Sequence, residues 1–489
     1  MNYRLLEMIP GLLSWLTLIL MFLLSWLTPI AAAIFIILFD IYWLFKTIYL
    51  SVHLRSSFSK MKSNLKTNWQ EKLKNLKWEN IYHLVILPMH SEPYGVIRET
   101  FESLKNNNYP KNRFILALAT EERAGEESKQ IAQKIKSEYE NYFFKLIVTN
   151  HPKDLPDEIP GKGSNESWAA QEVKQSAIDP LKIPHENILV SVFDIDTQIF
   201  PDYFGCLTYN FLTCEHPQRS SFQPIPFFMN NIYQAPALAR VVSFSATFWH
   251  LMQQSRPERL TTFSSHSMPF KALVEIGYWH RNIVSEDSRI FWQCYLHYNG
   301  DWRVVPLLYP ISMDANVAPT FSKTLLNTYK QQRRWAYGAE NIPYLLSGFS
   351  KKNIPLKAKL FWAFNQIEGM HSWATNSLII FALGWLPILL GGESFNYTLL
   401  SHNLPMITHR IMLAASAGIV TSAILSVILL PKKPNWFKPY HYLGYFLQWI
   451  LMPATLIIFG SIPALEAQTR LMLGGKFRLG FWVTPKGRY

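Results

Sequence analysis

From residue 8 to residue 39 the chain carries no charged side chain. A single membrane span needs only about 20 apolar residues, so this run is too long for one helix. Pro29 divides it, because proline interrupts a helix and favours the start of the next one. We therefore predict two transmembrane helices within residues 1–50, at about 9–27 and 29–50. A cleaved signal peptide fits poorly, since its apolar core is much shorter and no small-x-small cleavage site follows.

The segment after these helices is basic. Residues 51–80 hold seven Lys and Arg against two Glu. Loops rich in Lys and Arg remain on the cytoplasmic side of a membrane. We therefore predict a basic cytoplasmic linker at 51–80 and a cytoplasmic domain after it, in a protein integral to the inner or plasma membrane.

The charge of the whole chain agrees with this placement. Lys and Arg outnumber Asp and Glu by 47 to 34, which gives a net charge of +13. An anionic membrane face or an anionic substrate explains such a balance. Nucleic acid is not expected as a partner, since the basic excess clusters beside apolar segments. The three cysteines have no metal-ligand spacing and are expected to be reduced core residues: Cys206, Cys214 and Cys294.

Residues 81–350 have the pattern of a soluble α/β domain. Apolar runs typical of buried strands alternate with helical patterns. The runs lie at 82–88, 113–120, 143–149 and 188–194, and the helical patterns at 94–105, 127–140 and 165–177. This alternation predicts a Rossmann-like, doubly wound parallel sheet. Ligands of such sheets bind beyond the carboxyl ends of the strands.

Apolar segments return after this domain. Residues 351–368 include an amphipathic stretch that is expected to lie in the membrane interface. Residues 369–465 contain about three uncharged runs, at 369–392, 411–431 and 439–465. If the third run crosses the membrane, the basic tail at 466–489 lies outside, against the positive-inside rule. We expect a cytoplasmic tail, with the third run re-entrant or broken into two pieces at its Pro and Gly residues.

Two aspartates follow the last predicted strand of the series. Asp194 and Asp196 stand one residue apart at the end of the run 188–194. Paired carboxylates at that position suit Mg²⁺ or Mn²⁺ bound to a nucleotide diphosphate. A D-x-D sequence is short, so the alternative is a pair of solvated loop aspartates.

Two further motifs follow in the same domain. Glu286 and Asp287 stand at the head of a predicted helix, where a carboxylate can accept a proton from a sugar hydroxyl. The alternative is an ordinary acidic first turn favoured by the helix dipole. Gln331, Arg334 and Trp335 form Q-x-x-R-W, in which Arg suits a phosphate and Trp suits the face of a sugar ring. The alternative is a basic amphipathic surface helix.

The order of these motifs resembles that of the processive members of glycosyltransferase family 2, the cellulose, chitin and hyaluronan synthases. The resemblance covers about residues 81–350 and extends to the flanking apolar helices. "GKGSNESWA" (161–169) and "LPMHSEP" (87–93) are similar to two other motifs of that family, and "FWVTPKG" (481–487) resembles the gating loop of cellulose synthases. The resemblance implies a GT-A-like cytosolic domain with a parallel or mixed sheet.

The resemblance also implies roles for individual residues. Asp287 would be the general base, and Asp194 and Asp196 would hold Mg²⁺ or Mn²⁺. Glu286 and Trp335 would contact the acceptor. The nucleotide-sugar donor would be bound by Glu92, Glu121, Lys162, Asp194, Gln331, Arg334, Thr484 and Lys486.

Three segments depart from the family pattern, and one of them is "HSE" (90–92), which stands where the family has N-E. Glu121 and Glu122 replace the aspartate pair that reads uracil, which leaves the nucleotide base open. "SSHSMPF" (264–270) does not match the family's acceptor-contacting segment.

The expected function is inverting transfer of a sugar from a nucleoside diphosphate, with UDP the expected nucleotide, to a growing polysaccharide, coupled to its passage across the membrane. Transfer of one sugar to a lipid is the alternative. A membrane protein that only senses a nucleotide sugar is less favoured. The sugar, linkage, oligomeric state and regulation are not determined by the sequence.

Overall fold

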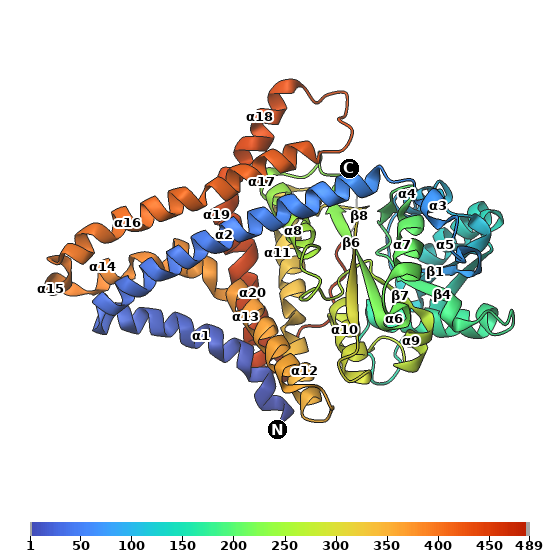
Figure 1. The fold of residues 1–489 in the computed structure, drawn as a ribbon, viewed down its shortest axis with the longest axis horizontal. Coiled ribbons are helices and arrows are strands. Elements are labelled where there is room, and N and C mark those ends of the chain that lie inside the picture. Colours follow the sequence, from blue (N-terminus) through green and yellow to red (C-terminus); the bar gives the residue numbers. More distant parts are fainter. Residues whose placement is uncertain (1, 486–489) are drawn as a thin grey trace.

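The computed structural model of the protein describes residues 2–485. An α/β part is built around one sheet, and long apolar helices extend from it, on the left in Figure 1. The strands are β1 (Tyr82–Pro88), β2 (Phe114–Glu121), β3 (Lys145–His151), β4 (Ile188–Val192), β5 (Gln198–Ile199), β6 (Ser220–Phe228), β7 (Ser267–Pro269) and β8 (Arg303–Met313). The helices of the α/β part are α3 (Trp69–Leu73), α4 (Tyr94–Lys105), α5 (Gly125–Tyr139), α6 (Lys162–Val173), α7 (Tyr203–Thr213), α8 (Ala237–Gln253), α9 (Phe270–Glu275), α10 (Glu286–His297), α11 (Phe321–Ala336) and α12 (Asn341–Phe349).

The sheet is mixed, with the strand order β3-β2-β1-β4-β7-β6-β8-β5. Strands β1 to β4 pair in parallel, as the alternating pattern predicts. Strand β7 is antiparallel to both of its neighbours, whereas β6 and β8 are parallel to each other. The β6 and β8 sequences contain prolines, which lack the N–H that a central strand donates. Pro224 lies where the β6–β8 register shifts, between Gln223 and Ile225, so the sheet accommodates it at an irregularity.

The sheet is buried on both faces. On β1, Val85 and Leu87 point to one core cluster, while Leu84 and Ile86 point to the other. This alternation follows from the two-residue period of a strand. Helices α4 and α7 cover the first face, and α6 and α10 cover the second. The carboxyl ends of the parallel strands therefore open between two helical layers.

The remaining helices are mostly apolar. They are α1 (Tyr3–Leu27), α2 (Pro29–Leu65), α13 (Leu356–Phe381), α14 (Leu386–Leu390), α15 (Gly392–Asn396), α16 (Leu399–Ala415), α17 (Ala417–Ile428), α18 (Pro439–Leu447), α19 (Met452–Thr455) and α20 (Ile462–Leu473). Among the described residues, four helical segments are long and apolar enough to cross a membrane, or five if α13 and α14, bent by 50°, form one span.

Two boundaries differ from those predicted. Helix α2 does not end near residue 50 but continues to Leu65 through the basic segment. Leu54 and Met61 lie two turns apart on the same face of α2. They belong to the same buried cluster as Phe227 and Phe244 of the α/β part, and this burial stabilises the extension. The amphipathic stretch within 351–368 is likewise not a separate helix, because α13 runs through it without a break.

The segment Pro439–Leu473 lies along the α/β part. Near its start, Trp449 stacks on Phe248 of α8, with 5.7 Å between ring centroids. Near its end, Glu466 accepts a hydrogen bond from Arg333 of α11 at 2.6 Å. Between them the chain is π-helical at Leu456–Ser461. Figure 1 shows α20 running beside α11, so both halves of this continuous helical segment meet the same part of the protein, and the predicted break into two pieces is not present.

The two ends of the chain also meet. Ser14 of α1 donates to Gln468 of α20 at 2.8 Å. Beyond α20, the Arg478 guanidinium donates to Glu7 at 2.6 and 2.7 Å. The start of α1 and the tail after α20 therefore lie on the same side of the helical bundle.

Candidate active site

Three predicted site residues lie at one edge of the sheet because β1, β2 and β4 are parallel. Glu92 follows β1 and accepts a hydrogen bond from the His90 N–H at 2.7 Å. Glu121 ends β2 and is ion-paired with Arg123. Asp194 follows β4. The strand ends thus place three carboxylates around the opening expected to receive a nucleotide.

Asp194 and Asp196 have different surroundings. The Asp194 carboxylate accepts from the Ser264 hydroxyl at 3.0 Å and lies 3.0 Å from the Lys162 ammonium. Asp196 is fully buried, and its Oδ2 accepts from the Asp314 N–H, just after β8, at 2.8 Å. The Asn230 amide links the two halves of this corner by donating to the Asp196 carbonyl and to the Asp314 side chain. Asp194 therefore borders the opening, and Asp196 anchors its floor.

Lys162 is the centre of the site. Its ammonium lies 2.9 Å from Asp287, 3.0 Å from Asp194, 3.4 Å from Glu166 and 3.8 Å from Glu286. Residues that are distant in the sequence, Asp194 and Asp287, therefore share one cation.

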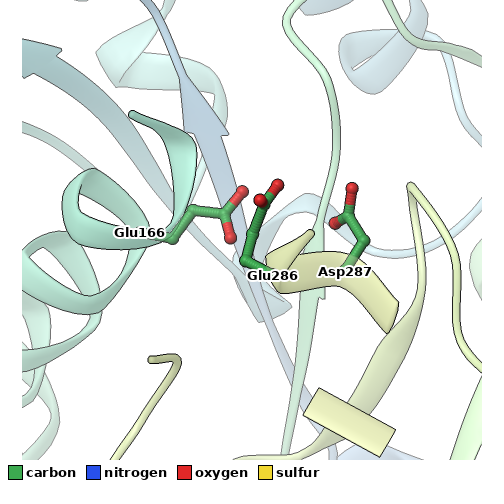
Figure 2. Close-up of side chains that lie close together, drawn as sticks. All are labelled: Glu166, Glu286 and Asp287. Atoms are coloured by element: carbon green, nitrogen blue, oxygen red, sulfur yellow. The ribbon is translucent and has the colours of Figure 1, made fainter. Parts of the chain in front are cut away.

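The close approach of α6 to α10 depends on Gly163. A Cβ at this position would lie 2.9 Å from the His280 carbonyl oxygen and 3.0 Å from the Glu286 Cβ. No side chain fits there without a shift of the backbone or of α10. Gly163 thus allows Glu166, on α6, to meet the carboxylates at the start of α10, as Figure 2 shows.

Burial and like charge govern the protonation of this cluster. Glu166 and Glu286 are almost fully buried. Burial first, and then Asp287, raise the pKa of Glu286 to about 8, against a partial lowering by Lys162. The pKa of Glu166 is raised well above its usual range by burial, despite Lys162. Burial opposes the charge of Lys162, but the four carboxylates outweigh it and hold its pKa well above its usual value.

Two sets of oxygens fit a divalent cation by their chemistry. Asp194 and Asp196 form the predicted set. Glu166, Glu286 and Asp287 form a second, with ligand oxygens within 4.8 Å of one another. Carboxylate oxygens are the ligands that Mg²⁺ and Mn²⁺ favour. In this structure the cation that meets the second set is the Lys162 ammonium.

The Q-x-x-R-W motif lies on the opposite wall, on α11. Trp335 packs against Phe228 at the end of β6, with 5.6 Å between ring centroids. Gln331 and Trp335 line a small hollow together with Asp314, the residue that donates to Asp196. The motif therefore reaches the same opening as the aspartates.

The C-terminal tail crosses this opening. Phe481 lies directly against Gly161, since a Cβ on that glycine would be 2.7 Å from the Phe481 Cγ. The Arg334 guanidinium lies 4.9 Å from the Phe481 ring centroid. Thr484 is buried, and Lys486 lies outside the described residues. The segment that resembles a gating loop thus packs against Gly161, the residue before Lys162, and against Arg334.

Several residues of this site were not assigned from the sequence. Glu166 stands one helical turn after Lys162, within a motif that the sequence already indicated. Ser264 lies in the segment that departs from the family pattern, and its contact with Asp194 explains why that segment returns to the site. Asp314 follows strand β8. The sequence pattern did not predict this strand, because it contains prolines.

Replacing Glu286 is expected to change how stability depends on pH. A carboxyl whose folded pKa is about 8, against an ordinary value of 4.5, stabilises the fold fully below pH 4.5, and this contribution is lost as the pH rises through 8. The thermal unfolding midpoint of Glu286→Gln, measured in EDTA from pH 5 to 9, should therefore fall less steeply with pH than that of the wild type. Glu71→Gln, at a side chain 69 % exposed, is the control and should keep the wild-type slope. Equal slopes in all three proteins would contradict the raised pKa.

The comparisons with known proteins agree with these features. A model of the family described as glycosyl transferase family group 2 matches residues 189–465, more than half of the chain. No curated protein sequence gives a match.

Similar solved structures are distant from this chain. The mannosyltransferase PcManGT from Pyrobaculum calidifontis, in complex with GDP-Man and Mn²⁺, is 12 % identical, with a TM-score of 0.42, over 84 % of this chain and 97 % of that one. Residues 1–349 of S. aureus TarS, in complex with UDP-GlcNAc, are 15 % identical, with a TM-score of 0.37, over 70 % of this chain and 90 % of that one.

The family match includes all but the first residue of β4, the D-x-D, E-D and Q-x-x-R-W motifs and the following apolar helices as far as the start of α20. The chain therefore belongs to glycosyl transferase family group 2, and the protein is a glycosyltransferase.

Proposed function

We propose that the protein transfers a sugar, with inversion, from a nucleoside diphosphate to an acceptor hydroxyl at the cytoplasmic face of a membrane. The observation that carries the proposal is the bridge that Lys162 makes between Asp194, on the donor side, and Asp287, on the acceptor side. The leaving diphosphate and the attacking acceptor hydroxyl would then both lie next to one charged cluster.

Asp287 is the proposed general base. The acceptor oxygen forms a bond to the anomeric carbon, its proton passes to the Asp287 carboxylate, and the bond to the diphosphate breaks on the opposite face with its electrons on the phosphate oxygen. The Lys162 ammonium donates to the two Asp287 carboxylate oxygens at 2.9 and 3.1 Å. A bound diphosphate offers Lys162 a competing anion, and transfer of the ammonium to it would release the base.

Charge neutralisation supplies most of the remaining catalysis in this proposal. Asp194 and Asp196 are the residues that would hold Mg²⁺ or Mn²⁺, and the ion would neutralise charge on the diphosphate. Arg334 and Gln331 would assist from α11. Glu92 and Glu121 would contact the nucleoside, with UDP the expected nucleotide.

The acceptor side is proposed to include Trp335 and Glu286. Trp335 offers a ring face beside the hollow of α11. Phe481 and Thr484 would close over the donor, together with Lys486, and thereby exclude water from the reaction. The contacts of Phe481 with Gly161 and Arg334 support a closing role for this tail.

The proposed membrane placement has α1, α2, α13–α14 and α16–α17 crossing, with the α/β part and the tail in the cytoplasm. Pro439–Leu473 would not cross, since both of its ends contact the α/β part. An even number of crossings then leaves the basic tail and the catalytic domain on the same side.

The loss of Asp287 should abolish transfer but not donor binding. Release of nucleoside diphosphate is measured for the purified protein with a panel of nucleotide sugars, Mg²⁺ and Mn²⁺. Removing a general base costs about 10²–10⁴-fold in rate, so Asp287→Asn should lose at least about 10²-fold with its favoured donor. Nucleotide binding, followed by calorimetry, should stay within a few-fold of the wild type. Wild-type turnover by Asp287→Asn would remove it as the base.

The two candidate sets of metal ligands, Asp194–Asp196 and Glu166–Glu286–Asp287, predict different responses to metal. Chelation should stop release of nucleoside diphosphate, and Mn²⁺ or Mg²⁺ should restore it. If the ion is held by Asp194 and Asp196, the half-activating Mn²⁺ concentration should rise by about tenfold or more in Asp194→Asn. Glu166→Gln should leave it unchanged. The opposite pattern would place the ion in the Glu166–Glu286–Asp287 set, and full activity in chelator would exclude both.

Growth of a polysaccharide, coupled to its passage across the membrane, is the proposed outcome of repeated transfer. The motif Q-x-x-R-W and the tail over the opening favour it over transfer of one sugar to a lipid. Membranes incubated with a radiolabelled donor should then yield a ladder or a high-molecular-weight band on a gel. A single lipid-extractable product would favour the lipid acceptor, and donor binding without any transfer would favour a sensor.

A further inference from the structure

Two arginines lie side by side just after α8, outside the site described above. The Arg259 N–H donates to the Arg256 carbonyl at 3.0 Å, so both side chains leave one tight turn. The Arg256 guanidinium lies 5.1 Å from the ring centroid of Tyr49, on α2. Its Nε is buried and makes no hydrogen bond within residues 2–485. Among the same residues, the Arg259 side chain forms no hydrogen bond or ion pair.

Two acidic side chains, Glu258 and Glu368, offset the charge of this pair only in part. Glu258 lies 3.6 Å from the Arg256 Nε, but its side chain is 58 % exposed. Glu368 of α13 is engaged by Lys46 of α2 at 3.4 Å. Burial, and then the neighbouring Arg256, lower the pKa of Arg259. Two adjacent guanidinium groups of this kind are stabilised by an anion that both can contact.

The surroundings of the pair are apolar on both sides. Helix α2, which contacts Arg256, exposes Phe45 (64 %), Ile48 (52 %) and Val52 (61 %). Helix α13, which carries Glu368, exposes Leu360 (61 %) and Phe364 (67 %). An anion with long apolar chains matches such a site better than a soluble anion, because the chains would cover these faces.

The chain that leaves the pair leads directly into the catalytic cluster. The Thr262 hydroxyl donates to the Asp287 carbonyl at 2.6 Å, and the Ser264 hydroxyl donates to Asp194 at 3.0 Å. Only two residues separate Arg259 from Thr262, a reach of about 10 Å at most. The same segment includes Phe263, whose ring centroid lies 5.0 Å from that of Trp249, a side chain that is 43 % exposed.

We propose that Arg256 and Arg259 bind the phosphate group of an anionic membrane lipid at the membrane-facing mouth of the active site. The proposal rests on the membrane placement given above, but binding does not require that the lipid be glycosylated. A lipid held there has its headgroup one short segment from Asp287.

The test is lipid binding by the detergent-solubilised full chain, followed by native mass spectrometry. Dioleoyl phosphatidate and dioleoyl phosphatidylcholine are titrated separately. The wild type should bind phosphatidate more tightly. Charged hydrogen bonds of this kind justify a loss of about tenfold or more in phosphatidate affinity for Arg256→Gln/Arg259→Gln. Arg98→Gln/Arg303→Gln, on the α/β part, is the matched control and should bind as the wild type does.

Each outcome decides the proposal. Equal affinity of the wild type for the two lipids, or wild-type affinity in Arg256→Gln/Arg259→Gln, would overturn it. Displacement of the lipid by an equal concentration of inorganic phosphate would assign the pair to a free anion instead. If the double variant does not fold, as judged by its thermal unfolding midpoint, Arg259→Gln alone carries the test. Since the measurement needs no donor or turnover, it remains informative even if Asp287 proves not to be the base.

Discussion

The Lys162 ammonium is the interaction on which the site depends. It lies within 4.0 Å of four carboxylates, two of them almost fully buried. One positive charge does not balance four negative ones in a medium of low dielectric, so protons or a further cation must share the cluster. Burial is the main cause of the raised pKa values of Glu166 and Glu286, and the neighbouring carboxylates add to it. A donor diphosphate, itself anionic, has to enter with a cation or draw on Lys162.

The α11 wall of the site is held to the apolar helices by a second charged centre. Glu466 of α20 accepts hydrogen bonds from Tyr329, Arg333 and Arg470 at 2.6–2.7 Å. The next residue of α11, Arg334, contacts Phe481 of the tail. Movement of α20 relative to the α/β part would therefore displace Arg333, and with it the neighbouring Arg334. This arrangement gives a physical route by which the helical bundle and the catalytic opening are linked.

The sequence predicts what local pattern determines. The strand 82–88 and the helix 94–105 have the observed bounds of β1 and α4, because their apolar periodicity is uninterrupted. Strands β6 and β8 could not be predicted in this way, because prolines interrupt their apolar pattern. Glu166 escapes it for another reason: a glutamate on a helix becomes part of the site only because Gly163 lets α10 approach. The extension of α2 to Leu65 could likewise not be predicted, because it depends on packing against the α/β part.

Asp287, as the proposed general base, favours one of the two sets of carboxylates that could bind a divalent cation. A divalent ion bound by Glu166, Glu286 and Asp287 would compete with the acceptor's proton for the Asp287 carboxylate, which would weaken it as a proton acceptor. Asp194 and Asp196 would hold the ion without using Asp287 as a ligand, which would leave Asp287 to the acceptor as proposed. Lys162 already lies between Asp194 and Asp287 as a monovalent cation. Under the proposed roles, its ammonium would separate the carboxylates that hold the metal from the carboxylate that accepts the proton, so that the two functions could coexist.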